Sequence, residues 1–140
     1  MTTPGNDLVV LDTSVVSLFL RNADQAGYYI REIAGRRVVI SFQTYEEALF
    51  GAIKGDWGAR RVNQLRLHLD QYELLGVTPE LINICAHLRS ERESAGRALK
   101  TADAWIAASA LLLRCPLATT DGDFEGIPEL DVIRAPSQSE

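Results

Sequence analysis

The stretch LVVLDTS, from Leu8 to Ser14, constrains the fold more than any other segment of the chain. Its four consecutive aliphatic residues predict a short strand buried on both faces, and such strands lie in the middle of parallel sheets. The strand ends at Asp12, and the apolar stretch VVSLFL predicts a helix directly after it. Ligands of open α/β sheets bind at this edge, but an Asp here can also serve as the helix N-cap. The role of Asp12 therefore depends on whether other acids reach the same edge.

The rest of the chain alternates between short apolar strands and helices. Strands are predicted at 38–41, 72–77, 117–119 and 130–133, and helices at 23–34, 42–54, 79–95 and 102–114, with one more helix capped by Asp56. We expect Thr101 to cap the helix at 102–114. This alternation predicts a three-layer α/β/α sandwich with a short, mostly parallel central sheet. We expect this sandwich to form a single domain over residues 8–133, with flexible ends at 1–7 and 134–140.

The composition is that of a folded soluble protein, since 46% of the 140 residues are hydrophobic and 24% are charged. No run approaches the roughly 18 apolar residues of a membrane span, and the N-terminal MTTPGND lacks the basic and apolar regions of a secretory signal. Cys85 and Cys115 lie in apolar surroundings far apart in the sequence, which favours two buried thiols over a disulfide or a zinc site. We therefore expect a cytoplasmic protein with no membrane partner.

The net charge of −5 would by itself argue against a nucleic acid partner, but the charge is unevenly distributed. Residues 1–100 hold twelve basic and twelve acidic side chains, whereas residues 101–140 hold two basic and seven acidic ones. The excess negative charge thus belongs to the last forty residues, and a local basic surface can exist elsewhere.

Carboxylates occur near the ends of several other predicted elements. Glu46 and Glu47 lie in the helix after the second strand, Asp103 lies in the first turn of its helix, and Asp121 and Asp123 follow the fourth strand. Each has an ordinary explanation: a solvated helix face for the glutamates, the helix dipole for Asp103, and turn formation for the last two. If the first and fourth strands are parallel neighbours, however, these acids meet at one edge of the sheet.

Several carboxylates in one cleft repel each other unless some are protonated or a cation neutralises them. Ligand sets made only of oxygen suit Mg²⁺ or Mn²⁺ better than zinc. Such ions lower the pKa of a bound water and hold a phosphodiester for in-line attack. The sequence offers no nucleophilic Ser/His/Asp set and no glycine-rich phosphate loop, so a carboxylate metal site is the chemistry that it indicates.

Four segments carry a family resemblance: VVLDTS, ISFQTYEEALFG, KTADAWIAASAL and LATTDGDFEGIPEL. In this order they resemble the signature segments of PIN-domain ribonucleases, and most of all those of the VapC-type toxins of bacterial toxin–antitoxin pairs. The resemblance covers residues 8–133, and Ser14 stands where the family usually has Asn. It implies a metal-dependent endoribonuclease that hydrolyses RNA phosphodiester bonds with Mg²⁺ or Mn²⁺.

The resemblance also assigns residues. The family's four acids fall on Asp12, Glu47, Asp103 and Asp121, where Glu47 stands four residues before Gly51. Asp123 lies beside the fourth acid in a turn slightly shorter than usual, so which of the two aspartates reaches the metal stays open. The metal ligands implied are therefore Asp12, Asp103, Asp121 and Asp123. Small polar residues that can hydrogen-bond the carboxylates or a metal water are Thr13, Ser14 and Thr119.

An acidic cleft must still hold a polyanion, so basic side chains outside it must bind flanking phosphates. The candidates are Arg21, Lys54, Arg97 and Lys100, and of these Lys100 is nearest to a site residue in the sequence. For toxins of this kind the resemblance further implies a homodimer and a small cognate antitoxin that blocks the cleft. The alternative is a non-catalytic module of the same fold that binds RNA or a protein.

Overall fold

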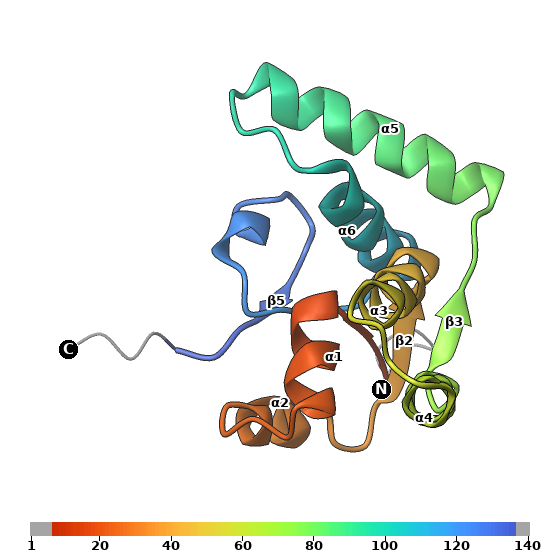
Figure 1. The fold of residues 1–140 in the computed structure, drawn as a ribbon. Coiled ribbons are helices and arrows are strands. Elements are labelled where there is room, and N and C mark those ends of the chain that lie inside the picture. Colours follow the sequence, from red (N-terminus) through yellow and green to blue (C-terminus); the bar gives the residue numbers. More distant parts are fainter. Residues whose placement is uncertain (1–6, 137–140) are drawn as a thin grey trace.

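The computed structural model describes residues 7–136, and in this range five strands alternate with six α-helices and one 3₁₀-helix (Figure 1). In chain order the elements are β1 (Leu8–Leu11), α1 (Thr13–Leu20), α2 (Ala26–Ile33), β2 (Arg37–Ser41), α3 (Phe42–Lys54), α4 (Ala59–Leu69), β3 (Glu73–Leu75), α5 (Pro79–Ser94), α6 (Thr101–Leu113), β4 (Leu117–Ala118), η1 (Gly122–Phe124) and β5 (Val132–Ile133). All five predicted strands are present, most of them shorter than expected.

The strands form one parallel sheet in the order β3-β2-β1-β4-β5. The strand β1 lies at its centre and pairs with β2 on one side and with β4 on the other. The Asp12 N–H extends this last pairing, since it donates to the Ala118 carbonyl oxygen at 2.9 Å. The predicted neighbourhood of the first and fourth strands is therefore confirmed, and their carboxyl ends meet at the same edge.

Helices cover both faces of the sheet, as the alternation of side chains along β1 requires. Val9 and Leu11 pack into a core with side chains of α1, α2 and α4. Leu8 and Val10 point to the other face, where they pack against α6 and α5. Each of these four residues is at most 9% exposed, so the strand is buried on both faces. The three-layer sandwich is confirmed.

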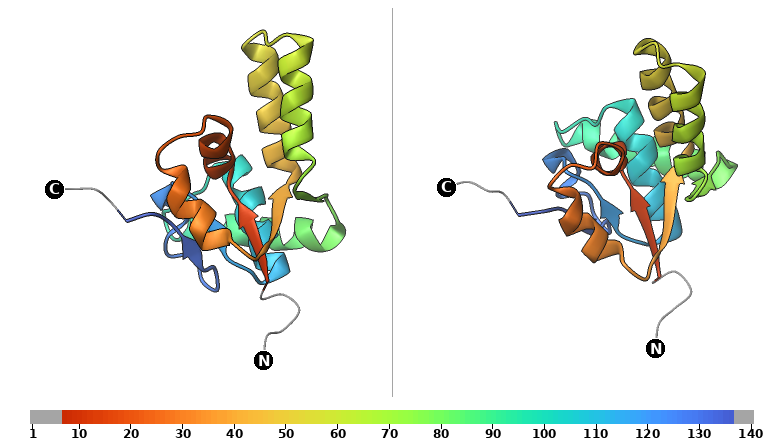
Figure 2. Two further views of the ribbon diagram at one scale, coloured as in Figure 1. Left: turned by 90° about the horizontal axis from the view of Figure 1, so that it is seen from below. Right: turned by 60° about the horizontal axis from the view of Figure 1, so that its bottom comes forward.

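Two helices extend beyond these layers. Figure 2 shows α3 and α4 lying side by side as a helical hairpin that stands out from the sheet. The hairpin begins at Ser41, whose hydroxyl accepts a hydrogen bond from the Gln43 N–H at 3.0 Å. The start of α3 is thereby fixed directly at the carboxyl end of β2.

Several helix starts differ from the prediction. The helix α2 begins at Ala26, three residues later than expected. Asp56 does not cap α4: its φ of 57° is left-handed, and Gly58 takes the N-cap position. Thr101 is the first residue of α6 rather than its cap, a position held by Lys100 without a side-chain hydrogen bond. A cap is set by the path of the preceding loop, which composition does not fix.

Three further expectations concern the chain as a whole. Cys85 and Cys115 are free and buried, as predicted. None of the helices in residues 7–136 combines the length and hydrophobicity needed to cross a bilayer. The predicted flexible ends lie largely outside the described residues. Of the predicted C-terminal end, residues 134–136 are described, and there the Ala135 N–H donates to the Tyr29 hydroxyl at 3.0 Å.

Candidate metal centre

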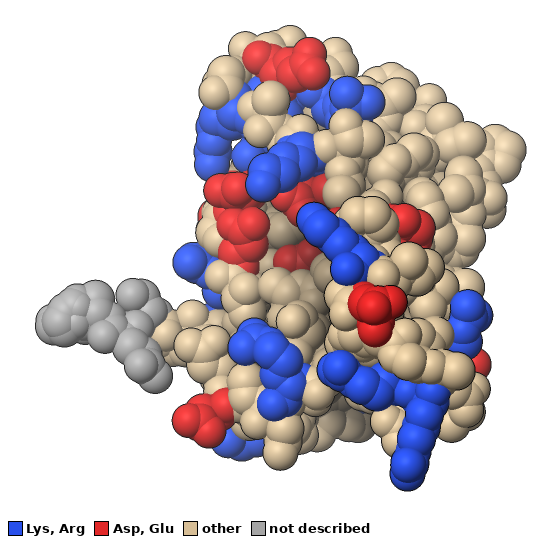
Figure 3. All heavy atoms as spheres, in the orientation of Figure 1, with Lys and Arg blue, Asp and Glu red and all other residues tan. Residues whose placement is uncertain are grey.

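A cleft of about 610 Å³ opens at the carboxyl edge of the sheet, between α1, α3, the start of α6 and the turn after β4. Figure 3 shows acidic side chains gathered in and beside a hollow on this face, with Lys and Arg side chains around it. The cleft is lined by Asp12, Thr13, Ser14, Glu47, Lys100, Ala102, Asp103, Thr120, Asp121, Gly122 and Arg134. It thus brings together the four acids at Asp12, Glu47, Asp103 and Asp121.

Asp12 is the most buried of these acids, with 5% of its surface exposed. Its Oδ1 accepts a hydrogen bond from the Thr13 N–H at 2.8 Å, so Asp12 itself is the N-cap of α1. Its Oδ2 accepts hydrogen bonds from Ser14 Oγ at 2.8 Å and from Thr119 Oγ1 at 2.7 Å. These contacts hold the carboxylate in one orientation toward the cleft.

The helix glutamate is oriented by the residue next to Asp12. Thr13 Oγ1 donates to Glu47 Oε1 at 2.7 Å and lies 3.0 Å from Thr44 Oγ1. Glu47 is half-buried, whereas its neighbour Glu46 is exposed and does not line the cleft. The two adjacent glutamates are therefore in different environments, and Glu47 is the one at the site.

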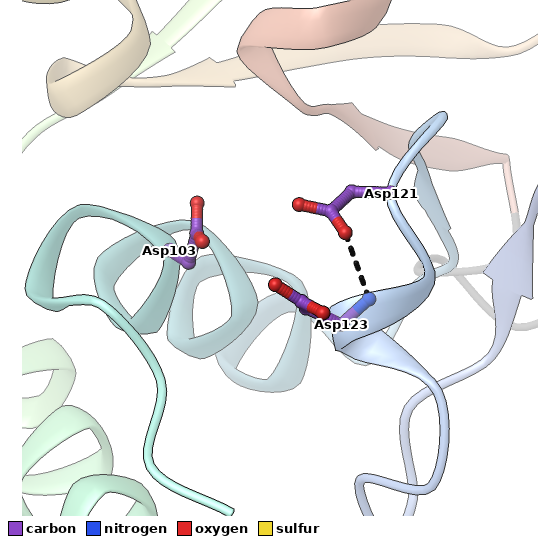
Figure 4. A group of neighbouring side chains, drawn as sticks. All are labelled: Asp103, Asp121 and Asp123. Atoms are coloured by element: carbon purple, nitrogen blue, oxygen red, sulfur yellow. Dashed lines mark hydrogen bonds between the residues drawn. The ribbon is translucent and has the colours of Figure 1, made fainter.

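Three aspartates form a compact group within the described residues. Asp103, Asp121 and Asp123 each offer a carboxylate oxygen, and these oxygens lie within 4.8 Å of one another. Figure 4 shows Asp103 at the start of α6 facing the turn after β4 that carries the other two. The turn is shaped by its own polar groups, because Asp121 Oδ1 accepts from the Asp123 N–H at 2.9 Å and Thr119 Oγ1 accepts from the Asp121 N–H at 3.0 Å.

Two acids of the cleft, Asp12 and Asp103, have raised pKa values, mainly because they are buried. Burial raises the pKa of Asp12 despite the hydrogen bonds from Thr119, Ser14 and Thr13, which lower it. Burial, together with the negative charges of Asp12 and Asp121, raises the pKa of Asp103 to about 6. Both carboxylates thus carry their charge at a cost that a bound cation would remove.

The donor set fits a small, hard divalent cation. It contains only carboxylate oxygens, of which three lie within 4.8 Å of one another. Hard ions such as Mg²⁺ and Mn²⁺ take oxygen ligands of this kind. The described residues at the cleft include no histidine or cysteine, which zinc and copper sites generally use. Asp103, Asp121 and Asp123 could hold the ion, and Asp12 and Glu47 border the same space.

The four basic candidates were expected outside the cleft, and the structure brings one of them to its lining. Lys100 lines the cleft, but Arg21, Lys54 and Arg97, although described, do not. Lys54 lies 5.9 Å from the centre of the Phe50 ring, and Arg97 donates to the Glu125 carbonyl oxygen at 3.1 Å.

The second cation at the cleft is Arg134, which sequence reasoning missed. It lies just after β5, in a segment that was expected to be flexible, and nothing in its sequence surroundings indicates proximity to the acids. Its Nε donates to the Thr120 carbonyl oxygen at 3.2 Å. This contact brings a positive charge to the side of the cleft formed by the turn after β4.

The chain belongs to the PIN domain family, whose model matches residues 9–130. The match includes Asp12, Glu47, Asp103, Asp121 and Asp123, and it covers β2, β3, β4 and all but the first residue of β1. A comparison with curated protein sequences finds no match.

Among solved structures, similar chains occur in toxin–antitoxin complexes, several of which are VapBC complexes. A chain of VapBC2 from Rickettsia felis, bound to a promoter DNA fragment, is 21% identical with a TM-score of 0.81, covering 92% of this chain and 99% of that one. A chain of a toxin–antitoxin complex from Klebsiella pneumoniae is 26% identical with a TM-score of 0.73, covering 89% and 95%. A chain of VapBC-5 from Mycobacterium tuberculosis is 27% identical with a TM-score of 0.68, covering 92% and 99%.

Proposed function

We propose that this protein is a Mg²⁺- or Mn²⁺-dependent endoribonuclease and the toxin of a toxin–antitoxin pair. The observation that carries the proposal is the convergence of Asp12, Glu47, Asp103 and Asp121 on one cleft, although they come from four separate segments of the chain. Membership of the PIN domain family and the similarity to VapC toxins support it.

Each acid has a defined task in this proposal. Asp103 and Asp121 hold the cation from opposite walls of the cleft, and Asp123 lies close enough to share in binding it. Asp12, whose carboxylate is fixed by hydrogen bonds, is a further ligand in this proposal, and Glu47 completes the set of acids beside it. A divalent cation bound there would lower the pKa of a water molecule and offset the charge of a phosphodiester. Lys100 at the rim attracts the RNA backbone toward the acids.

Cleavage of a labelled RNA by the purified protein tests the enzymatic part of the proposal. We expect cleavage with Mg²⁺ or Mn²⁺ and none after chelation with EDTA. Asp12→Asn and Asp103→Asn should abolish the cleavage, because each removes a carboxylate charge from the site. Circular dichroism of both variants checks that the fold is intact.

Two results would contradict this activity. One is cleavage by the Asp12→Asn/Asp103→Asn double variant at the rate of the unchanged protein. The other is calorimetric titration in which Mn²⁺ binds no better to the unchanged protein than to Asp12→Asn. The second result would favour a non-catalytic module that binds RNA or protein.

The toxin role needs a separate experiment. Induced expression in a bacterial host should stop growth, and expression of Asp12→Asn should not. A short neighbouring reading frame, coding for a DNA-binding protein of about a hundred residues or fewer, would supply the antitoxin. Its co-expression should restore growth and block RNA cleavage by the purified pair. Growth at the normal rate during expression of an active ribonuclease would contradict the toxin role alone.

A further inference from the structure

The turn that carries two of the acids is held by arginines from three different places. We define the acidic turn as residues 120–126, which include Asp121, Asp123 and Glu125. Its Thr120 carbonyl accepts from Arg134 Nε at 3.2 Å, its Asp123 carbonyl from Arg92 Nη2 at 3.2 Å, and its Glu125 carbonyl from Arg97 Nη2 at 3.1 Å. The main chain of the acidic turn is therefore fixed near both ends and in the middle.

Arg92 is the least expected of these residues, because a buried arginine normally has a carboxylate partner. It lies in the last turn of α5 and is 7% exposed. The ion pairs among the described residues are Arg37–Glu73 and Arg134–Glu125, so Arg92 has none there. Its Nε is also the one buried side-chain nitrogen or oxygen of the described residues without a hydrogen-bond partner. The side-chain hydrogen bond that Arg92 makes among the described residues is the one to the Asp123 carbonyl.

Arg92 and Arg97 contact the acidic turn outside the acidic cleft. Both line a separate cavity of about 1090 Å³ between α5, the end of α6 and the loop before β5. Neither lines the acidic cleft. Their contacts with the turn are hydrogen bonds to its main chain, so any effect on the site passes through that main chain.

The acidic turn is also shaped to receive the arginines. A Cβ at Gly126 would lie 3.0 Å from Arg97 Nη1, and a Cβ at Gly122 would lie 3.3 Å from Arg134 Nη1. Gly126 in addition has a φ of +84°, which side-chain-bearing residues rarely adopt. Glycines thus stand beside two of the guanidinium groups.

We propose that Arg92, Arg97 and Arg134 form a clamp that holds the acidic turn so that Asp121 and Asp123 face Asp103. They are positioning residues: they set where two carboxylates lie and offset their charge, but do not themselves touch the cation. This inference rests on the metal site of the proposed function and does not depend on RNA being the substrate.

The test uses Arg92→Met and Arg97→Met, with Arg92→Lys as the conservative variant and Arg89→Met, an exposed position on the same helix, as the matched control. The first measurement is the ¹⁵N order parameter of the amides in residues 120–126, in EDTA. The second is the affinity for Mn²⁺ by calorimetry without RNA. Thermal melting of each variant separates a local effect from a general loss of stability.

We expect Arg92→Met and Arg97→Met to lower the order parameters of the acidic turn and to weaken Mn²⁺ binding about 10- to 100-fold, the usual effect of removing a group that orients metal ligands. Arg92→Lys should recover part of the affinity, and Arg89→Met should match the unchanged protein. Variants that keep both the order parameters and the Mn²⁺ affinity, whatever their melting temperature, would overturn the clamp.

Two experimental outcomes need a further measurement: a variant that does not fold, and an unchanged protein that binds no Mn²⁺. If Arg92→Met does not fold, Arg97→Met and Arg134→Met, both at exposed positions, decide the question by the same measurements. If the unchanged protein binds no Mn²⁺, the proposed function fails, while the order parameters in EDTA still decide whether the clamp exists.

Discussion

Thr119 donates a hydrogen bond to Asp12 at 2.7 Å, although the two residues are 107 positions apart in the sequence. Both lie directly after neighbouring strands of the sheet, β4 and β1, and both are buried. The same Thr119 oxygen accepts from the Asp121 N–H at 3.0 Å. One hydroxyl group therefore links the most buried acid of the cleft to the turn that carries the others.

Removing this hydroxyl should destabilise the protein. We expect Thr119→Val to lower the free energy of unfolding by about 1.5–3 kcal/mol, the usual worth of a buried hydrogen bond to a charged group. Urea denaturation at pH 7 measures the loss, with Thr120→Val, which keeps the Asp12 contacts, as the control. An unchanged midpoint for Thr119→Val would show that the Asp12 carboxylate does not need this donor.

The two adjacent glutamates provide a matched pair for the metal site. We expect Glu47→Gln to reduce metal-dependent RNA cleavage by more than about 100-fold, since loss of groups that merely orient metal ligands already costs 10- to 100-fold. Glu46→Gln, one position earlier on the same helix and exposed, should leave cleavage within about 2-fold. Initial rates at saturating Mn²⁺ measure both, and equal effects of the two changes would remove Glu47 from the site.

The stability of the metal-free protein should depend on pH. Burial and neighbouring charge raise the pKa of Asp103 from 3.8 to about 6, so between these values the folded protein binds more protons than the unfolded chain. The free energy of unfolding should therefore fall as the pH rises through this window, and Asp12, whose pKa is also raised, adds to the same trend. Denaturation midpoints in EDTA at pH 4.5 and pH 7 measure the difference.

Two comparisons make the pH prediction specific. Asp103→Asn should reduce the dependence, because the variant lacks the group that titrates. Saturating Mn²⁺ should stabilise the protein more at pH 7 than at pH 4.5, since the ion binds the ionised carboxylates. A dependence that is identical in the Asn variant would mean that another group is responsible.

The position of Lys100 predicts a role in holding RNA. In the Asp12→Asn background, where RNA is bound without cleavage, Lys100→Met should weaken binding and reduce the slope of log affinity against log salt by about 1. Lys54→Met should not, because Lys54 does not line the cleft. Fluorescence anisotropy of a labelled RNA over a salt series distinguishes the two lysines.

The sequence predicts the acids of the cleft better than the groups that hold them. Asp12 and Asp121 follow strands and Asp103 lies in the first turn of its helix, and parallel strands bring such positions to one edge. Glu47 lies further along α3, and its assignment came from the family resemblance. Ser41 and Thr78 each accept a hydrogen bond at the start of a helix, whereas the expected caps Asp56 and Thr101 do not take that position.

The contacts of the arginines with the acidic turn could not be predicted from the sequence, because their partners are main-chain carbonyls. Arg92 and the Asp123 carbonyl are 31 residues apart, and a carbonyl has no sequence signature that would pair it with a particular side chain. The same holds for Arg134, whose place after β5 depends on how that strand joins the sheet. Basic residues can be counted in a sequence, but which of them reach the cleft is a tertiary property.

The central place of β1 has a consequence for the newly made chain. It pairs with β2, which follows closely in the sequence, but also with β4 near the other end. Asp121 and Asp123 reach Asp103 only when β4 has entered the sheet beside β1. A ribosome must therefore synthesise nearly the whole domain before the carboxylates can meet, and the unfinished polypeptide cannot assemble its metal centre.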